Sequence, residues 1–338
     1  MGTKRRAYIE EIARRIGRRK LVWFGHNGSN ARPLTSLPQF SRAFSVMSPA
    51  GLGDHREVCI EHLTGERVRT GGHELHPETS EVDRQFHQQV FDSLGEPTVT
   101  VTHQASRFFA SVYFLRREFV QHLGLFHERQ VVFDHKPWVE TELREIGIRV
   151  VPWRYLATHD ANLRPALERA LQGGPLVLRA NRSISGRGLT MVRHPDEIAQ
   201  VGEGTNPDGF IAVAPFLEPS VPLNVNACVF PDGTVSLHSP SLQLIGIPGA
   251  GSPFTYCGND FAQVRELDEA ILDTLQEMAT RVGRWLCSMG YAGAFGVDAL
   301  LYQGAVYLTE VNPRFQGSSL VSASLDAELD RPDMYLTH

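Results

Sequence analysis

Near its C-terminal end the chain reads Gly296-Val297-Asp298-Ala299-Leu300-Leu301-Tyr302, then Gln303-Gly304, then Val306-Tyr307-Leu308-Thr309-Glu310-Val311-Asn312-Pro313-Arg314. Two apolar runs on either side of a glycine-containing turn predict a β-hairpin. Few polar residues interrupt these runs: Asp298 on the first strand, and Glu310 and Asn312 on the second. These three side chains are the candidates for chemistry in the hairpin.

The faces of the two strands depend on the register of the hairpin. Side chains two residues apart on a strand share a face, so Glu310 and Asn312 point the same way. Asp298 joins them only if it pairs opposite Glu310, because a slip of one residue reverses the faces of a strand. That register requires a three-residue loop or a bulge. A tight two-residue turn would instead place Asp298 opposite Thr309.

The first register brings two carboxylates and an amide oxygen together in an apolar sheet. Hard oxygen ligands of this kind suit Mg²⁺. Arg314 follows as a fixed cation that can hold phosphate oxygens. The alternative interpretation is that Asp298 and Glu310 are solvent-facing residues of an edge hairpin. It accounts less well for Asn312-Pro313-Arg314 and for the Gly/Ser turn at residues 316–319.

The pattern of Asp298 followed by Glu310-Val311-Asn312-Pro313-Arg314 resembles the metal-binding end of the ATP-grasp superfamily. Members of this superfamily activate a carboxylate as an acyl phosphate. The resemblance covers roughly residues 133–325, and it implies an α/β ATP-grasp fold, α+β in the nucleotide lobes, with a Rossmann-like N-terminal lobe. We therefore expect an N-terminal lobe at 1–133 and an ATP-grasp region at 134–338. Within that region we expect a small lobe with a Gly-rich loop at about 160–217, and a metal and substrate lobe at about 218–330.

Composition restricts the class of protein. The 338 residues suffice for two or three packed lobes, with 42% hydrophobic and 21% charged residues as in a globular protein. A net charge of −5 provides no basic field for nucleic acid. The four cysteines lack CxxC spacing, and no apolar run approaches the length of a membrane span. Because the first twenty residues do not form a secretory signal, we expect a cytoplasmic protein that contacts neither nucleic acid nor membrane.

Apolar periodicity predicts the other elements. Helices are expected at residues 5–19, 78–94, 134–146, 162–171, 195–201, 268–289 and 318–329. Strands are expected from residue 20 and at 44–47, 58–63, 98–102, 148–152, 175–180, 189–192, 210–218, 223–230 and 234–237. The strand from residue 20 opens a Rossmann-like unit but lacks GxGxxG, so no dinucleotide site is expected there. Residues 32–40 are expected to form a loop, and residues 239–260 a long functional loop.

The resemblance also implies nucleotide contacts. Lys136, just before a helix, matches a lysine that contacts the nucleotide phosphates, although an exposed lysine is the alternative. Arg179 stands where the family usually has lysine, and a planar fork is not equivalent to an ammonium. The loop Asn181-Arg182-Ser183-Ile184-Ser185-Gly186-Arg187-Gly188 is either a solvated hairpin tip or a flexible Gly-rich loop over ATP. The resemblance favours the second, with Ser185, Gly186, Arg187 and Gly188 as contacts. It further implies adenine contacts from the backbone of Phe216 and Leu217 and a ribose contact from Glu218.

A narrower resemblance points to stand-alone carboxylate–amine ligases of natural-product biosynthesis, including the pheganomycin-type peptide ligases. It rests on Phe24-Gly25, Ala31-Arg32-Pro33-Leu34 and Leu37-Pro38-Gln39-Phe40. It implies Mg²⁺, or alternatively Mn²⁺, on Asp298, Glu310 and Asn312, and a catalytic Arg314. The expected substrates are ATP, a small-molecule carboxylate and an amine, both of which an amino acid or peptide provides. The sequence leaves open whether the protein forms a homodimer.

Two other functions remain open at this point. One is an ATP-dependent carboxylase or carboxylate kinase, which uses the same activated intermediate without an amine acceptor. The other is a non-catalytic ATP-binding protein on an ATP-grasp scaffold, for which Arg179 and the short segment after Arg314 are the support.

Overall fold

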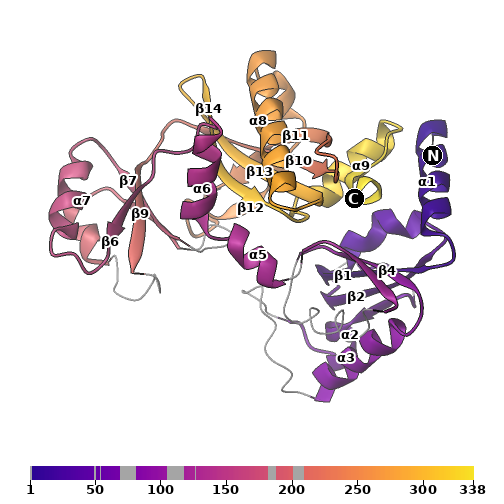
Figure 1. Cartoon of the computed structure of the whole chain (residues 1–338). Helices are drawn as coiled ribbons and strands as arrows, with labels where there is room; N and C mark the ends of the chain where they lie inside the picture. Colours follow the sequence, from indigo (N-terminus) through magenta and orange to yellow (C-terminus); the bar gives the residue numbers. More distant parts are fainter. Residues whose placement is uncertain are drawn as a thin grey trace.

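The computed structural model describes residues 2–48, 51–53, 55–68, 81–104, 118–125, 127–181, 188–200 and 209–338. These residues form three β-sheets with flanking helices. The smallest sheet lies at one end of the molecule, the N-terminal sheet at the other, and the largest sheet between them (Figure 1). No helix in the described part of the chain is long and apolar enough to cross a membrane.

The N-terminal sheet is parallel, with the strand order β3-β2-β1-β4-β5. Its strands are β1 (Lys20–Asn27), β2 (Phe40–Met47), β3 (Glu57–Cys59), β4 (Thr98–Thr102) and β5 (Val120–Leu123), and its helices are α1 (Thr3–Ile16), η1 (Gly28–Ser36), α2 (Ile60–Thr64) and α3 (Glu81–Ser93). The chain leaves β1 on one side and returns as β4 on the other, so the strand order reverses between them, as in Rossmann-like sheets. The predicted Rossmann-like lobe is therefore confirmed.

Two local predictions in this lobe were wrong. Residues 58–63 were expected to be one strand, but β3 ends at Cys59 and α2 begins at Ile60. Residues 32–40 were expected to be a loop, but Gly28–Ser36 forms the 3₁₀ helix η1, which begins where Asn27 accepts a hydrogen bond from the Ser29 amide. Short apolar runs are compatible with either a helix or a strand, and tertiary packing decides between them.

The smallest sheet is antiparallel in the order β6-β9-β7-β8. It comprises β6 (Arg154–Ala157), β7 (Leu176–Ala180), β8 (Leu189–Val192) and β9 (Phe210–Pro215), and it carries α7 (Leu163–Leu171) and η2 (Pro195–Gln200). The strand predicted at 148–152 is wrong, because only Val150 forms a bridge there, to Leu308. Pro152 has no amide proton to donate, so the ladder cannot continue through it.

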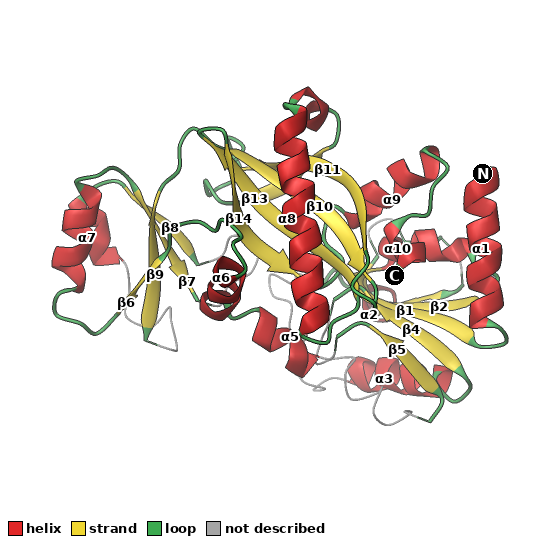
Figure 2. Cartoon of the chain, turned by 45° about the horizontal axis from the view of Figure 1, so that its top comes forward, coloured by secondary structure: helices red, strands yellow, loops and turns green. Residues whose placement is uncertain are grey.

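The largest sheet is antiparallel in the order β12-β11-β10-β13-β14. It comprises β10 (Val221–Val229), β11 (Val235–Ile245), β12 (Tyr256–Asp260), β13 (Gly293–Tyr302) and β14 (Ala305–Asn312). Around it lie α5 (His127–Phe133), α6 (Lys136–Glu145), η3 (Gln263–Glu266), α8 (Glu269–Ser288), α9 (Ser319–Glu328) and α10 (Met334–Thr337). Helix α6 lies between the smallest and the largest sheets in both views (Figures 1 and 2).

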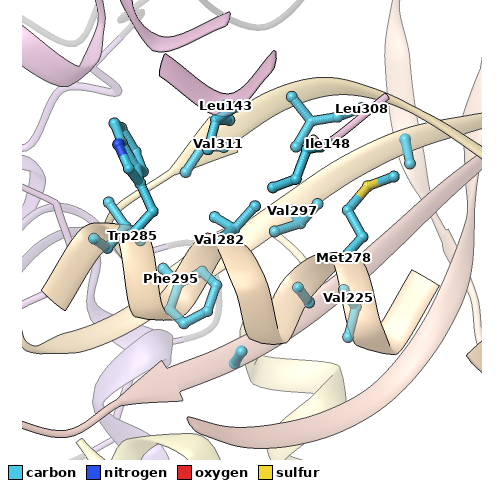
Figure 3. Packing of buried hydrophobic residues seen from close by; sticks show 14 of the residues in the cluster. Leu143, Ile148, Val225, Met278, Val282, Trp285, Phe295, Val297, Leu308 and Val311 are labelled. Carbon is cyan, nitrogen blue, oxygen red and sulfur yellow. The ribbon is translucent and has the colours of Figure 1, made fainter. Parts of the chain in front are cut away.

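The two faces of the largest sheet differ in chemistry. On one face, Met278, Val282 and Trp285 of α8 pack over apolar strand residues such as Phe295 and Val297 (Figure 3). The alternate residues of the same strands point to the other face, and they include Asn224 on β10 and Asp298 on β13, which pair directly. The polar side chains of this sheet therefore gather on the face away from α8.

Residues 246–255 form a loop as predicted, and the polar face explains why the predicted loop at 239–260 was wrong at its two ends. Strand β11 continues to Ile245, and β12 forms at its edge. Ser241 accepts a hydrogen bond from Asn259, and Gln243 donates to Asp298. The alternating apolar signal of a half-buried strand is weak here, because the inward residues serve a polar network instead of the core.

One apolar core joins residues from both ends of the chain. Its members include Leu21 and Trp23 of β1 together with Phe315, Met334 and Tyr335. The Phe315 ring stacks on Tyr335 at 4.4 Å and on His103 at 5.8 Å, and its backbone amide donates to the His103 carbonyl. The lobe boundary that we placed at residue 133 stays a proposal, and this core crosses it.

Gly283 provides a test of the packing under α8. Replacing a mid-helix glycine by alanine usually stabilises a helix by roughly 0.5–1 kcal/mol. A Cβ atom at Gly283 would lie 2.7 Å from a methyl group of Val235 and 2.9 Å from the Phe295 ring. We therefore expect Gly283→Ala to destabilise the protein by about 1–3 kcal/mol in a denaturant titration. Glu277→Ala, at an exposed position of the same helix, is the control, and a stabilised Gly283→Ala protein would contradict this packing.

Candidate active site

The β13–β14 hairpin places Asp298 opposite Glu310 and Gly296 opposite Asn312. The turn contains only Gln303 and Gly304, both with positive φ, as tight two-residue hairpins prefer. A bulge then shifts the register between Asp298 and Ala299, so that Ala299 pairs with Leu308 while Asp298 pairs with Glu310. The register that brings the three polar side chains to one face is confirmed, and it arises through the bulge.

Asp298 is buried, with 9% of its surface exposed, and amide side chains surround its carboxylate. Its Oδ1 accepts hydrogen bonds from Asn224 at 2.7 Å, Gln243 at 3.0 Å and Gln316 at 3.3 Å. Its Oδ2 accepts one from Asn312 at 3.1 Å. Four neutral donors from different strands and from the segment after β14 thus fix the carboxylate without neutralising it.

Glu310 lies nearer the surface, with 32% of its side chain exposed, and the Lys136 ammonium donates to its Oε1. Burial alone would raise the pKa of Glu310, but the positive charges of Lys136, Arg314 and Arg179 outweigh burial and lower it. Burial and the nearby Glu310 charge raise the pKa of Asp298. The two carboxylates therefore repel one another, with Asp298 the harder to ionise.

This donor set fits a divalent cation. A cation between Asp298 and Glu310 would relieve the repulsion that raises the pKa of Asp298. The described residues contain no group of three or more His, Cys, Asp or Glu side chains that could hold a metal alone. Mg²⁺ does not require one, because it usually binds one or two protein carboxylates together with substrate phosphates. Asn312 lies on the same face, with its amide nitrogen turned to Asp298 and its side-chain oxygen to Arg314.

Arg314 lies directly beyond these ligands. Its Nη2 donates to the Asn312 side-chain oxygen and its Nη1 to the Phe315 carbonyl, both at 3.1 Å. Within the described residues it forms no ion pair. It borders a crevice at the carboxyl end of β4, where Thr102 and Gln104 face it. A partly buried guanidinium thus stands between the carboxylates and the crevice.

Arg179 lies on β7, 4% exposed, beside helix α6. Its Nη1 donates to Glu140 at 2.6 Å, and its guanidinium carbon lies 4.1 Å from the centre of the Trp153 ring. Its Nε and Nη2 are buried and have no hydrogen-bond partner among the described residues. These orphaned donors make the position suitable for an anionic ligand.

The structure says less about the other predicted nucleotide contacts, which are the Gly-rich loop and residues 216–218. Ser185, Gly186 and Arg187 lie outside the described residues, whereas the Gly188 carbonyl accepts a hydrogen bond from the Ala180 amide.

At the end of β9, the Phe216 amide donates to the Pro175 carbonyl at 2.8 Å, so this N–H group is already occupied. The Leu217 amide has no hydrogen-bond partner in the described part of the chain. The Glu218 side chain is 61% exposed.

Sequence reasoning missed the side chains that hold the site in place. Gln243 fell in a segment that we expected to be a loop. Glu140 gave one weak signal, because it follows Lys136 by four residues and so shares a face of α6 with it. Asn224 and Gln316 contact Asp298 across large sequence separations, which no local pattern reveals.

Part of the chain matches a known protein family. Residues 171–318 match the ATP-grasp domain family. The chain is 24% identical over 183 residues to formate-dependent phosphoribosylglycinamide formyltransferase from Dechloromonas aromatica, covering 53% of this chain and 44% of the relative. It is 29% identical over 153 residues to the carbamoyl phosphate synthase large chain from Halobacterium salinarum, covering 44% and 14%. The matched region thus spans less than half the length of these relatives.

Solved structures share the fold. Biotin carboxylase from Campylobacter jejuni has a TM-score of 0.63 at 16% identity, covering 90% of this chain and 67% of that one. D-alanyl-alanine synthetase A from Vibrio cholerae has a TM-score of 0.60 at 16% identity, covering 94% and 96%. The chain therefore has the fold of the ATP-grasp superfamily.

Proposed function

We propose that this protein is an ATP- and Mg²⁺-dependent ligase that activates a substrate carboxylate and joins it to an amine. The observation that carries the proposal is the pairing of Asp298 with Glu310, with Asn312 and Arg314 on the same edge of the site. The ATP-grasp fold and its similarity to a D-alanyl-alanine synthetase support it.

The reaction has two steps. A carboxylate oxygen of the substrate bonds to the γ-phosphorus of ATP, and the bond from that phosphorus to the β–γ bridging oxygen breaks, which releases ADP. The amine nitrogen then bonds to the acyl carbon, and inorganic phosphate leaves with the electron pair of the acyl–oxygen bond while the nitrogen loses a proton. Both steps develop negative charge next to the phosphoryl group, which is where fixed cations have their largest effect.

The residues of this chain have separate roles in the proposal. Lys136 and Arg179, with the loop at 183–188, hold phosphate oxygens. Phe216 and Leu217 contact the adenine through their backbone, and Glu218 contacts the ribose. Two of these assignments fall on cationic side chains of the described residues: Lys136, which contacts Glu310, and Arg179, which has two buried unpaired donors.

Asp298, Glu310 and Asn312 would hold the metal, with Mn²⁺ as an alternative to Mg²⁺. When bound, the metal neutralises charge on the transferring phosphoryl group. Lys136 neutralises Glu310 in this structure, and it would be available for phosphate oxygens if Glu310 held a metal instead. Arg314 stabilises the oxyanion that forms when the amine attacks.

The carboxylate and amine substrates are small molecules, and we propose an amino acid or a peptide. Thr102 and Gln104 line the crevice between Arg314 and the carboxyl end of β4. Ligands of open parallel sheets bind at the carboxyl ends of the strands, next to the point where the strand order reverses. Strand β4 is one of the two strands at that point.

The test is a screen for ADP release with pools of amino acids and amines and, in a separate arm, with bicarbonate. Amine-dependent ADP release with a stoichiometric amide product supports the ligase. ADP release without an amide product supports the alternative, a carboxylase or carboxylate kinase. The similarity in fold to biotin carboxylase favours this alternative. ATP binding without any turnover supports a non-catalytic ATP-grasp protein, and absence of ATP binding overturns the proposal.

A further inference from the structure

Two side chains contact the Arg179 guanidinium, and a third holds one of them. Glu140 accepts a hydrogen bond from Nη1, Trp153 lies under the plane of the group, and Tyr155 donates to the other oxygen of Glu140. Burial and the neighbouring carboxylate raise the pKa of Tyr155, so its hydroxyl keeps the proton that it donates. Glu140 is itself 3% exposed, and it links Arg179 of β7 to Tyr155 of β6.

The remaining edge of the guanidinium has no hydrogen-bond partner among the described residues. Nε and Nη2 lie on one side of the planar fork and together bind two oxygens of a single anion. Arg14 uses this same edge to hold Glu11, at 2.9 and 2.7 Å. In Arg179 both atoms are buried without a partner among the described residues, an arrangement that costs free energy unless a ligand fills it.

Helix α6 links this unpaired edge of Arg179 to the candidate active site. Glu140 and Lys136 are four residues apart on α6, and Lys136 contacts Glu310. The Arg179 charge also reaches Glu310, whose carboxylate it stabilises. Two cations, one at the start of α6 and one held by α6, therefore act on the same carboxylate.

We infer that Glu140 is a positioning residue that fixes Arg179, with Trp153 and Tyr155, so that its Nε–Nη2 edge holds two oxygens of a nucleotide phosphate. The inference rests on the proposed function. The device suits arginine, because a lysine ammonium at this position presents no planar edge and needs no orienting partner. Glu140 acts through Arg179 and does not itself touch the nucleotide, which a carboxylate would repel.

The test measures direct binding, with EDTA present so that the metal site does not contribute. ADP affinity is measured by isothermal titration calorimetry and adenosine affinity by ligand-observed NMR. We expect Glu140→Gln to weaken ADP binding by about tenfold or more, the size of a lost charge-assisted hydrogen bond, and to leave adenosine binding unchanged. Glu168→Gln is the matched control, because Glu168 forms an exposed ion pair with Arg164 in the same lobe.

A double-mutant cycle separates positioning from structure. In an Arg179→Lys background, Glu140→Gln is expected to cause little further loss of ADP affinity, because the residue acts through the arginine fork. Equal losses for ADP and adenosine, or an unchanged ADP affinity in a folded Glu140→Gln protein, would overturn the inference.

Tyr155→Phe removes only the hydroxyl that holds Glu140, and it provides the same test if Glu140→Gln does not fold. We expect it to weaken ADP binding severalfold, with adenosine binding unchanged, and an unchanged ADP affinity counts against the inference. A wild-type protein that binds neither ADP nor ATP overturns the proposed function instead, which distinguishes the two failures.

Discussion

Glu310→Gln is expected to lower the rate of ADP formation by roughly a thousandfold, because a metal supplies several kcal/mol of charge stabilisation and Glu310 is its most accessible carboxylate. The glutamine retains an oxygen that can accept from Lys136, so the melting temperature should change little. The measurement is steady-state ADP release with excess Mg²⁺, together with a thermal melt. Glu277→Gln, an exposed glutamate on α8, is the control. ADP formation near the wild-type rate would remove Glu310 from the metal site.

Asp298 needs a different substitution. Alanine would leave the amide groups of Asn224, Gln243 and Gln316 without their shared acceptor, and each buried donor left unpaired costs about 1–3 kcal/mol. A loss of activity in Asp298→Ala could therefore come from lost stability as well as from a lost metal ligand. Asp298→Asn removes the charge and keeps one oxygen for Asn224, Gln243 and Gln316, so that its new amide group faces only Asn312. A loss of activity much larger than the change in metal-free stability is therefore the more specific test of the metal site.

Arg314→Lys is expected to retain ATP binding and to lose on the order of 100-fold in kcat, the size found when one preorganised oxyanion donor is removed. The arginine is held at two points by Asn312 and by the Phe315 carbonyl, so its guanidinium is fixed before charge develops. An interaction that strengthens only in the transition state lowers kcat more than it raises KM.

The control for Arg314 is Arg84→Lys, which alters an exposed Arg84–Glu81 pair of the kind worth at most about 1 kcal/mol. Steady-state kinetics and denaturant titration are run on both variants. An unchanged kcat and an unchanged stability in Arg314→Lys would mean that Arg314 is structural, and that the reacting phosphoryl group lies elsewhere.

Apolar runs and a glycine turn are local signals, and they predicted both strands of the hairpin. The superfamily fold was implied by the resemblance of Asp298 and Glu310-Val311-Asn312-Pro313-Arg314 to the ATP-grasp motif. The sequence left the register of Asp298 open, because the deciding bulge opposite Asp298 depends on pairing and not on composition. It also took residues 239–260 for a loop, since the inward residues of β11 are polar where they serve Asp298.

Sequence patterns could not predict which carboxylates pair with the predicted cationic side chains. Arg179 and Glu140 are 39 positions apart, and Lys136 and Glu310 are 174 apart. Such pairs form only when α6 is packed between the smallest and the largest sheets, so no pattern within one segment predicts them.

The apolar core that joins β1 to Phe315, Met334 and Tyr335 also affects how the chain is made. A ribosome releases Leu21 and Trp23 roughly 15–60 s before Tyr335, at usual rates of translation. During that interval part of one face of the N-terminal sheet has no permanent cover. We expect nascent chains to hold this face against a chaperone or the ribosome surface, and to reach the native fold only after the last turn of helix has emerged.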